Sequence, residues 1–342
     1  MSKKEWMDID IDNLDLLEVS NVEKARVKQH VLKKRKKSKT WRNIVIAAVI
    51  MVSVTGATGF AFPTIAAQIP FMNHVISYFS NEEQQVYKNF DTFSTEMGLA
   101  KTSNGITVMI DKAVYDGTNI TVSYALETKH DLGDEREITA RNWFRVEGAD
   151  GGTFSEDVRK ISNTRYVCIA TFTPDFKDNR KPNEVQVTWK PEAFYSFSKD
   201  REFKGDWTFN FSLNRIEGDK LLVNKTVKNK NIDVTLSSIV FTDVSTIIAY
   251  DQIVTDEFLK KWPSVTPMFR VTDDLGHVYL EGSGGGGVTN DNGKTFKGST
   301  TFQSIQKDAN KLIIQPIAIA SLMYGNGHKK IELEPIIVDL KR

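Results

Sequence analysis

The chain has 342 residues, a formal net charge of +1 and one cysteine, Cys168. One thiol excludes an intramolecular disulfide, which argues against a eukaryotic secreted protein of this length and favours a bacterial surface protein. The length suits about two domains and one further short segment. The charge is unevenly distributed along the chain: residues 1–43 carry a net charge of +5, and the remainder carries −4. The only basic block adjoins an apolar run, so the sequence gives no indication of direct nucleic-acid binding.

The first 43 residues form an arm whose beginning interleaves acidic and aliphatic side chains. Ser20, with Glu23 three residues later, is a capping box that predicts a helix through about Lys37. So short an arm cannot bury enough surface to fold strongly alone, and its composition suits folding onto a protein partner. The residues expected to fill grooves on that partner are Leu14, Leu16, Leu17, Val22 and Val31. A tail that only positions the next segment is the alternative.

A basic block, Lys33–Arg42, precedes nineteen uncharged residues, Ile44–Phe62. A helix of that length spans roughly 28 Å, close to the bilayer core, so we expect a transmembrane helix at 44–62. The next twenty residues contain no Lys or Arg. The positive-inside rule therefore places the arm in the cytoplasm, with anionic lipid against the basic block, and the C-terminal part outside the cell. A cleaved signal peptide is the alternative, but its leader would be too long.

Two features of the apolar run bear on how a signal crosses the membrane. Thr55–Gly59 is a series of weak helix formers near the outer face, which suits local unwinding and cleavage by a membrane protease. Ser53, Ala57 and Ala61 lie four residues apart, and such small-residue stripes support pairing of membrane helices. The sequence leaves both interpretations open.

Residues 63–99 carry apolar side chains three and four positions apart, which predicts an amphipathic helical connector. Within it, Ser80 and Glu83 form a second capping box. We expect the connector to pack on the domain that follows it. The outer leaflet of the membrane is the alternative surface, although helices bound there are usually more basic.

From residue 100 onward the hydrophobic pattern changes to period two. Ile106–Ile110 and Trp207–Leu213 alternate apolar and polar residues, and turn residues such as Asp116–Gly117 separate the runs. This pattern is typical of short antiparallel strands with one buried face. We therefore expect a mainly β fold, with a first immunoglobulin-like β-sandwich at 100–216. A jelly roll and an open barrel are the alternatives.

The same plan recurs 125 to 130 residues further along the chain. The segments that return in order are Ile106–Val108 as Ile232–Val234, Val114–Tyr115 as Val240–Phe241, Tyr124 as Tyr250, Phe144–Val146 as Phe269–Val271, Thr171–Phe172 as Thr301–Phe302, and Asn183–Val187 as Asn310–Ile314. Matches in one order at near-constant spacing predict a second β-sandwich at 225–342. A polar linker containing Glu217–Lys220 would join the two.

No group of residues in the sequence indicates catalysis. Gly282–Gly284 lacks the first glycine of a nucleophile elbow. Gly284–Thr295 fails the spacing of a phosphate loop and of a calcium loop, so we expect a flexible hairpin tip. Asp273 and Asp274 are expected to form a turn. We expect no enzyme, metal or cofactor, because no histidines pair at ligand spacing: His30, His74, His130, His277 and His328.

Two sequence blocks carry a resemblance to a known family. They are FPTIAAQIPFMNHVISYF at 62–79 and GITVMIDKAVYDGTNITVSYALET at 105–128. With the short arm, the basic block and one span, they resemble the bacillus-type negative effectors (anti-sigma factors) of extracytoplasmic-function (ECF) sigma factors. Those proteins carry a membrane-proximal domain of unknown function 4179 and often a second immunoglobulin-like domain. The arm has no cysteine, unlike the zinc-containing anti-sigma domains with a His-x3-Cys-x2-Cys motif, so its hold on a partner would be metal-free.

The resemblance implies a single-pass anti-sigma factor in the membrane of a Gram-positive bacterium. Residues 1–39 would hold an ECF sigma factor at the membrane and keep it from transcription, and the external domains would sense an envelope signal. A structural or adhesive surface protein with immunoglobulin-like domains is the alternative. In that case the arm would have no specific partner.

Overall fold

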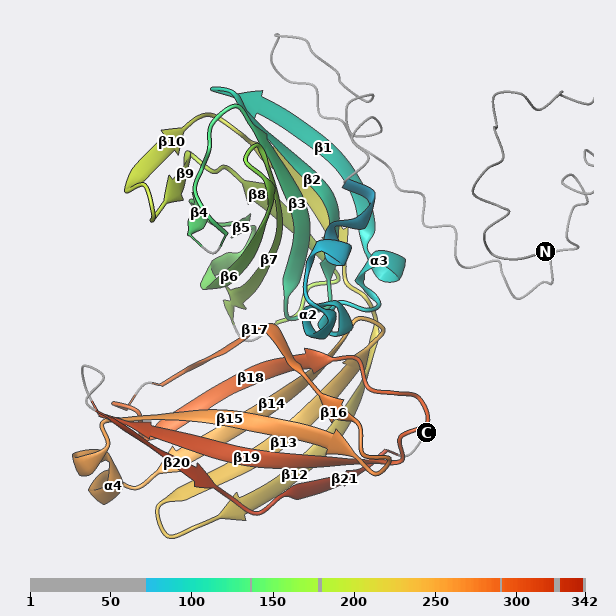
Figure 1. Cartoon of the computed structure of the whole chain (residues 1–342). Helices are drawn as coiled ribbons and strands as arrows, with labels where there is room; N and C mark the ends of the chain where they lie inside the picture. Colours follow the sequence, from blue (N-terminus) through green and yellow to red (C-terminus); the bar gives the residue numbers. More distant parts are fainter. Residues whose placement is uncertain (1–71, 136, 178–179, 290, 323–326, 341–342) are drawn as a thin grey trace, which may run out of the picture. The chain divides into compact units, whose positions relative to one another are not determined.

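The computed structural model describes residues 72–135, 137–177, 180–289, 291–322 and 327–340 (Figure 1). The chain divides into two compact units, Met1–Phe60 and Ala61–Arg342, and every described residue belongs to the second. The predicted transmembrane helix at 44–62 and the predicted partner-binding residues Leu14, Leu16, Leu17, Val22 and Val31 lie outside the described residues. Within the part described, no helix is long and apolar enough to span a membrane.

The described structure is mainly β, as predicted, and its helices are short. The helices are η4 (Met72–Tyr78, of 3-10 type), α2 (Asn81–Val86), α3 (Phe90–Phe93) and α4 (Asp256–Lys261). The predicted capping box at the start of α2 is confirmed: Ser80 Oγ accepts from the backbone N–H of Glu83, and Glu83 Oε2 accepts from that of Ser80.

The first β-region is formed by β1–β11, arranged in antiparallel sheets. Its strands are β1 (Thr95–Ser103), β2 (Ile106–Tyr115), β3 (Ile120–Thr128), β4 (Ile138–Arg141), β5 (Arg145–Val146), β6 (Ala149–Ser162), β7 (Arg165–Phe176), β8 (Glu184–Trp189), β9 (Ala193–Ser196), β10 (Arg201–Lys204) and β11 (Phe209–Asn214). The sheet orders are β1-β2-β3-β7-β6, β10-β9-β4 and β11-β8-β5. A single apolar core draws side chains from all three sheets, so the core lies between the five-stranded sheet and the two smaller ones.

The second β-region is formed by β12–β21 and repeats this plan. Its strands are β12 (Gly218–Lys228), β13 (Ile232–Thr242), β14 (Ser245–Val254), β15 (Ser264–Asp273), β16 (Val278–Tyr279), β17 (Glu281–Val288), β18 (Thr295–Gln303), β19 (Lys311–Ser321), β20 (His328–Glu332) and β21 (Ile336–Asp339). One sheet has the order β12-β13-β14-β18-β17, and the other has β16-β15-β19-β20 with β21 also paired to β19. A second apolar core lies between these two sheets.

The internal sequence matches fall on equivalent strands of the two regions. The start of β2 corresponds to that of β13, and Tyr124 of β3 corresponds to Tyr250 of β14. The five-stranded sheets share one order, because β1-β2-β3-β7-β6 maps onto β12-β13-β14-β18-β17. The repeat detected in the sequence is therefore a repeat of strand topology.

Two strand boundaries differ from the prediction. The residues predicted as a polar linker, 217–224, lie mostly in β12, which pairs with β13 along its length. The strand is an edge strand with mostly exposed side chains, and its lysines give it the composition of a linker. Similarly, β1 begins at Thr95, inside the predicted connector.

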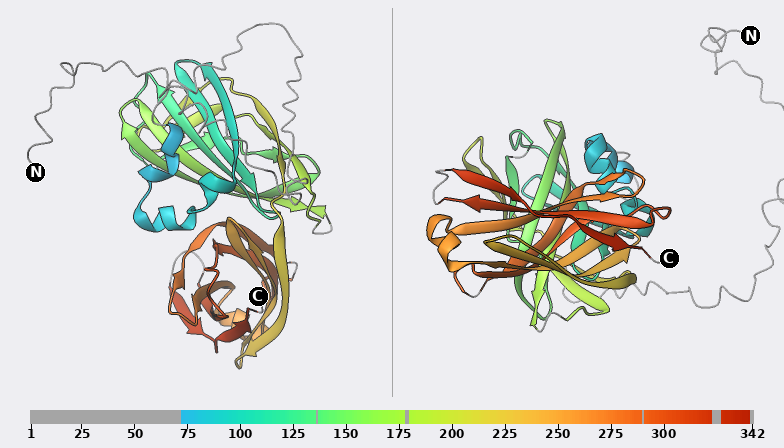
Figure 2. Two further views of the ribbon diagram at one scale, coloured as in Figure 1. Left: turned by 90° about the vertical axis from the view of Figure 1, so that its right-hand side faces the viewer. Right: turned by 90° about the horizontal axis from the view of Figure 1, so that it is seen from below.

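The helices at 72–93 pack on the outer face of the first region's five-stranded sheet (Figures 1 and 2). Val75, Phe79 and Phe90 form a buried cluster with residues of β2, β3 and β7, including Met109 and Val167. The expectation that these helices pack on the first β-region is therefore confirmed. Because helices cover the outer face and the core covers the inner one, β3 and β7 are buried on both faces along most of their length.

Candidate functional site

The hairpin turn between β2 and β3 reaches from the first β-region to the second. Asp116 is 6% exposed and shapes the turn, because its Oδ1 accepts from the backbone N–H groups of Thr118 at 2.8 Å and Asn119 at 2.6 Å. Gly117 supplies the positive φ of +88° that the turn requires. The other carboxylate oxygen of Asp116 accepts from Ser245 Oγ of the second region at 2.7 Å. The turn therefore places a buried carboxylate against β14.

Asn119 is the centre of this polar junction and is 2% exposed. Its Oδ1 accepts from Thr173 Oγ1 at 2.6 Å and from the backbone N–H of Gly285 at 2.9 Å. Its Nδ2 donates to Thr301 Oγ1 at 2.8 Å and to Asp116 Oδ2 at 3.3 Å. The side-chain amide thus uses both ends to connect β7 of the first region with β17 and β18 of the second.

The glycine-rich strand β17 is the surface that receives the hairpin. A Cβ on Gly284 would lie 2.5 Å from Asn119 Oδ1, and one on Gly282 would lie 2.9 Å from Val86 Cγ1. The strand is irregular at these two glycines, because its register against β18 shifts between Glu281 and Gly285. The prediction of a flexible hairpin tip at 284–295 is therefore wrong for its first residues, which pair with β18 as part of β17. Glycine is needed here because Asn119 and Val86 approach the backbone of β17 closely, and the local sequence does not reveal such distant contacts.

Further contacts extend the junction on either side of Asn119. Thr153 Oγ1 of β6 donates to the carbonyl oxygen of Gly285 at 2.9 Å. Near the helices, a cavity of about 40 Å³ separates α2 and α3 from the hairpin and from β14 and β18. That volume is sufficient for a water molecule or two. The junction is thus a buried, hydrogen-bonded polar contact between the two β-regions.

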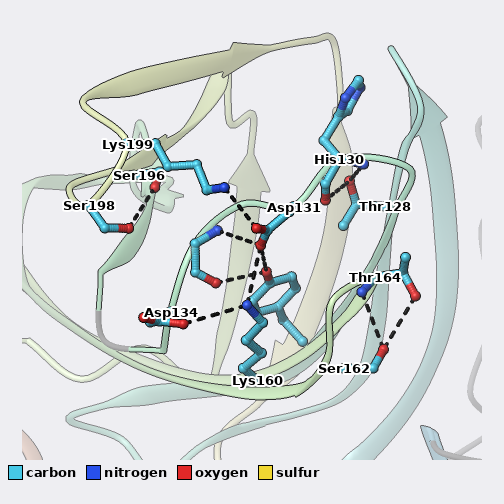
Figure 3. A network of polar contacts seen from close by, with 12 residues as sticks. Thr128, His130, Asp131, Asp134, Lys160, Ser162, Thr164, Ser196, Ser198 and Lys199 are labelled. Carbon is cyan, nitrogen blue, oxygen red and sulfur yellow. Dashed lines mark hydrogen bonds and ion pairs between the residues drawn. The ribbon is translucent and has the colours of Figure 1, made fainter.

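A second polar cluster lies within the first β-region, on the chain between β3 and β4 (Figure 3). Asp131 accepts from Lys199 Nζ at 2.8 Å and from Lys160 Nζ at 3.2 Å. Hydrogen bonds from Lys199, the backbone of Gly133 and Lys160 hold the pKa of the Asp131 carboxyl well below its usual range. The ionised carboxylate ties this chain segment to β6 and to the β9–β10 turn.

A third cluster surrounds the cysteine. The hydroxyl of Tyr124 donates to the carboxyl group of Glu156, whose other oxygen accepts from the backbone N–H of Ala140 at 3.2 Å. Burial raises the pKa of Cys168 well above its usual value, and burial likewise raises the pKa of Glu156. A buried thiol held in its neutral form is a poor nucleophile, so this cluster is unsuited to covalent catalysis.

A fourth cluster, Asp273 with His277 and Tyr279, closes a turn in the second β-region. Asp273 Oδ1 accepts from the backbone N–H groups of Leu275 and His277, both at 2.9 Å. Its Oδ2 accepts from Tyr279 Oη at 2.6 Å and His277 Nδ1 at 2.8 Å. Burial disfavours the charged carboxylate, but these hydrogen bonds outweigh it and lower the pKa of Asp273 to about 2. The predicted role of Asp273 as a turn former is confirmed.

We predict that Asp273→Asn lowers the free energy of unfolding at pH 7 by about 1–3 kcal/mol, because charged hydrogen bonds are lost. The native pKa lies below the ordinary value of 3.8, so this stabilisation is present above about pH 4 and fades as the pH falls toward 2. The difference in the free energy of unfolding between the native chain and the variant should therefore become smaller as the pH falls from about 4 to 2. Urea unfolding at pH 7, 4 and 2.5 measures it, and a constant difference would contradict the assignment.

The residues that the sequence analysis considered for chemistry do not come together. Among the described residues, no three His, Cys, Asp or Glu side chains lie close enough to hold a metal ion. His130 Nε2 donates to the carbonyl oxygen of Asn104 at 3.1 Å, and His277 contacts Asp273, so these two histidines belong to separate turns. The junction residues Asn119, Thr173 and Thr301 were not predicted. Asn119 lies within the block 105–128 and Thr301 within the internal repeat, but neither observation indicated a contact between the two.

Comparisons with known proteins match two segments of the chain to families of unknown function. Residues 36–128 match the family model DUF4179, a domain of unknown function, which confirms that part of the predicted resemblance. Residues 218–340 match DUF5643, a family of unknown function. No curated protein matches the chain.

Among solved structures that are similar to this chain, one covers most of its length. It is a conserved domain protein from Bacillus anthracis, with 26% sequence identity and a TM-score of 0.68, covering 75% of this chain and 94% of that one. Bovine butyrophilin has 11% identity, a TM-score of 0.17 and coverage of 67% and 94%. The collagen adhesin of S. aureus has 9% identity, a TM-score of 0.14 and coverage of 69% and 95%. The last two scores are too low to support a fold assignment.

Proposed function

We propose that this chain is a single-pass membrane anti-sigma factor. Its arm, residues 1–39, binds an ECF sigma factor in the cytoplasm, and its β-regions lie outside the cell and respond to an envelope signal. The observation that carries the proposal is the extent of the DUF4179 match, residues 36–128. That match runs from the basic block through the apolar run into β3, so these segments recur together as one unit. A protein of this layout has a means of linking the two sides of a membrane.

The same proposal assigns an immunoglobulin-like sandwich to each β-region. Each region has antiparallel sheets on either side of one apolar core. In β11 and β15 buried and exposed residues alternate, as they do in strands with one face in a sandwich core. Such modules suit ligand or partner recognition. The assignment includes no catalytic activity, no metal and no cofactor.

Polar groups within the described β-regions favour a sensor over an enzyme. The carboxylates of Asp116, Asp131 and Asp273 each accept hydrogen bonds that hold a turn. The junction at Asn119 joins the two regions by hydrogen bonds, and it would register a displacement of one region against the other. Signal transfer to the arm would then use cleavage of the span by a membrane protease, or a change in helix pairing.

The proposed topology predicts a specific pattern of protease sensitivity. In intact cells, an external protease should remove residues beyond Pro63, while a tag fused to Met1 stays protected. The physical reason is the cytoplasmic position that the positive-inside rule gives the basic block. Immunoblots against N-terminal and C-terminal tags measure both ends in one sample. Loss of the N-terminal tag before cells are lysed would reverse the orientation.

The functional test is transcriptional. Deleting the gene should raise a small, coherent set of transcripts that share a promoter motif, and expression of the full chain should return them to their basal level. A chain without residues 1–32, which retains the basic block and the span, should reach the membrane and fail to restore repression. Unchanged transcripts in the deletion strain would favour the structural or adhesive alternative.

A further inference from the structure

The short helices α2 and α3 are attached to the first β-region by apolar and ionic contacts. Phe90 is 3% exposed and belongs to the buried cluster with Met109 and Val167. Glu83 uses one carboxylate oxygen in the capping box and pairs the other with Arg159 of β6. The Arg159 side chain is 9% exposed and that of Glu83 is 27% exposed, so this ion pair is partly shielded from solvent. These contacts fix one side of the helical segment.

The opposite side of the same segment contacts the second β-region. Asn89, between α2 and α3, donates from Nδ2 to the carbonyl oxygen of Asp243 at 2.7 Å and to Ser304 Oγ at 3.0 Å. Val86, at the end of α2, lies against Gly282 of β17, where no Cβ would fit without displacement. The helices therefore lie between two surfaces that come from different halves of the chain.

The helices cannot be stable without those surfaces. α2 has six residues and α3 has four, far fewer than an isolated helix needs in water. The cavity of about 40 Å³ beside them further reduces their packing, since atoms lining a void lose contacts on one side. It is lined by Val86, Tyr87 and Phe90 from the helices and by Asn119, Ser245 and Thr301 from the junction. Both neighbouring surfaces contribute contacts to the segment.

We propose that the second β-region is a clamp that keeps α2 and α3 folded on the first. When β17 and the turn between β13 and β14 withdraw, the two helices unfold while the sheets of the first β-region remain intact. The device is an order–disorder switch in the segment that joins the β-regions to residues 1–71. It does not depend on the identity of any cytoplasmic partner, because its only requirement is the contact of the helices with β17 and Asp243.

Hydrogen exchange on the full-length chain in detergent micelles tests the clamp. Gly282→Ala places a methyl group against Val86, and Asn89→Ala removes both hydrogen bonds to the second region. Each variant should accelerate amide exchange in residues 81–93 by about tenfold, with β2 and β3 unchanged. Gly151→Ala is the matched control, because a Cβ there meets nothing within 4 Å.

A double variant distinguishes loss of the contact with the second β-region from a local effect of the substitution on the helices. Adding Val86→Ala to Gly282→Ala restores space at the contact, so helix protection should return toward the native level. Wild-type protection of residues 81–93 in both single variants would overturn the proposal. So would an equal loss of protection in β2 and β3, because the helices would then unfold only together with the sheet.

Discussion

Asn119→Ala should lower the free energy of unfolding of the full chain by about 3 kcal/mol at pH 7, since its buried partners lose hydrogen bonds. The hydroxyl groups of Thr173 and Thr301 lose their bonds to Asn119, and the backbone N–H of Gly285 keeps only its bond to Thr173 Oγ1 at 2.9 Å. Because Thr301 and Gly285 belong to the second β-region, the loss falls on the contact between the regions. Urea denaturation followed by tryptophan fluorescence measures the change.

Two further variants make this result specific. Asn210→Ala is the control, because Asn210 is exposed on β11 and its side chain accepts a hydrogen bond from Thr188 Oγ1 at 2.9 Å. It should change stability by less than about 0.5 kcal/mol. Asn119→Asp places a second carboxylate beside Asp116, which raises the pKa of the new group in the folded state. Its stability relative to wild type should therefore improve as the pH falls from 7 to 5. Equal stabilities of the alanine variants at 119 and 210 would contradict the assigned role of the junction.

Changing Leu14, Leu16 and Leu17 together to Asp should release the cytoplasmic partner. Each buried leucine contributes roughly 1.5–3 kcal/mol, so the combined loss in affinity exceeds about a thousandfold. The expected phenotype is constitutive transcription of the sigma target genes while the chain remains in the membrane. A reporter fused to one such promoter, read beside an immunoblot of the membrane fraction, measures both.

The matched control adds the same charge without removing an apolar side chain. Ser2→Asp, Asn13→Asp and Asn21→Asp introduce three carboxylates into the same arm, and repression should persist. If the leucine variant also represses normally, the arm has no groove-filling role. If the control variant derepresses as strongly as the leucine variant, charge and not burial determines binding.

Features set by neighbouring residues were predictable from the sequence. The capping box at Ser80 and Glu83 depends on residues three apart, and it forms as expected. Alternation in Trp207–Leu213 depends on the strand's own period, and the buried and exposed positions of β11 follow it. The repeat was recognisable because equivalent strands keep equivalent apolar residues, such as Tyr124 and Tyr250.

Features set by distant residues were not predictable. Asn119 acquires its role from Thr301, which lies 182 positions away. The glycines of β17 suggested flexibility, whereas their function is to admit Asn119 and Val86 at close range. β12 was mistaken for a linker because an exposed edge strand has linker-like composition, and only its pairing with β13 distinguishes the two.

Affinity capture of the full-length chain from solubilised membranes tests the central claim most directly. A tag after Arg342 isolates the chain from unstressed cells, and mass spectrometry identifies and quantifies the proteins that accompany it. The account predicts one small sigma factor in near-equal amount with the native chain, and its absence from the variant with Asp at positions 14, 16 and 17. Recovery of the intact native chain without a sigma factor, or equal recovery with both chains, would contradict it.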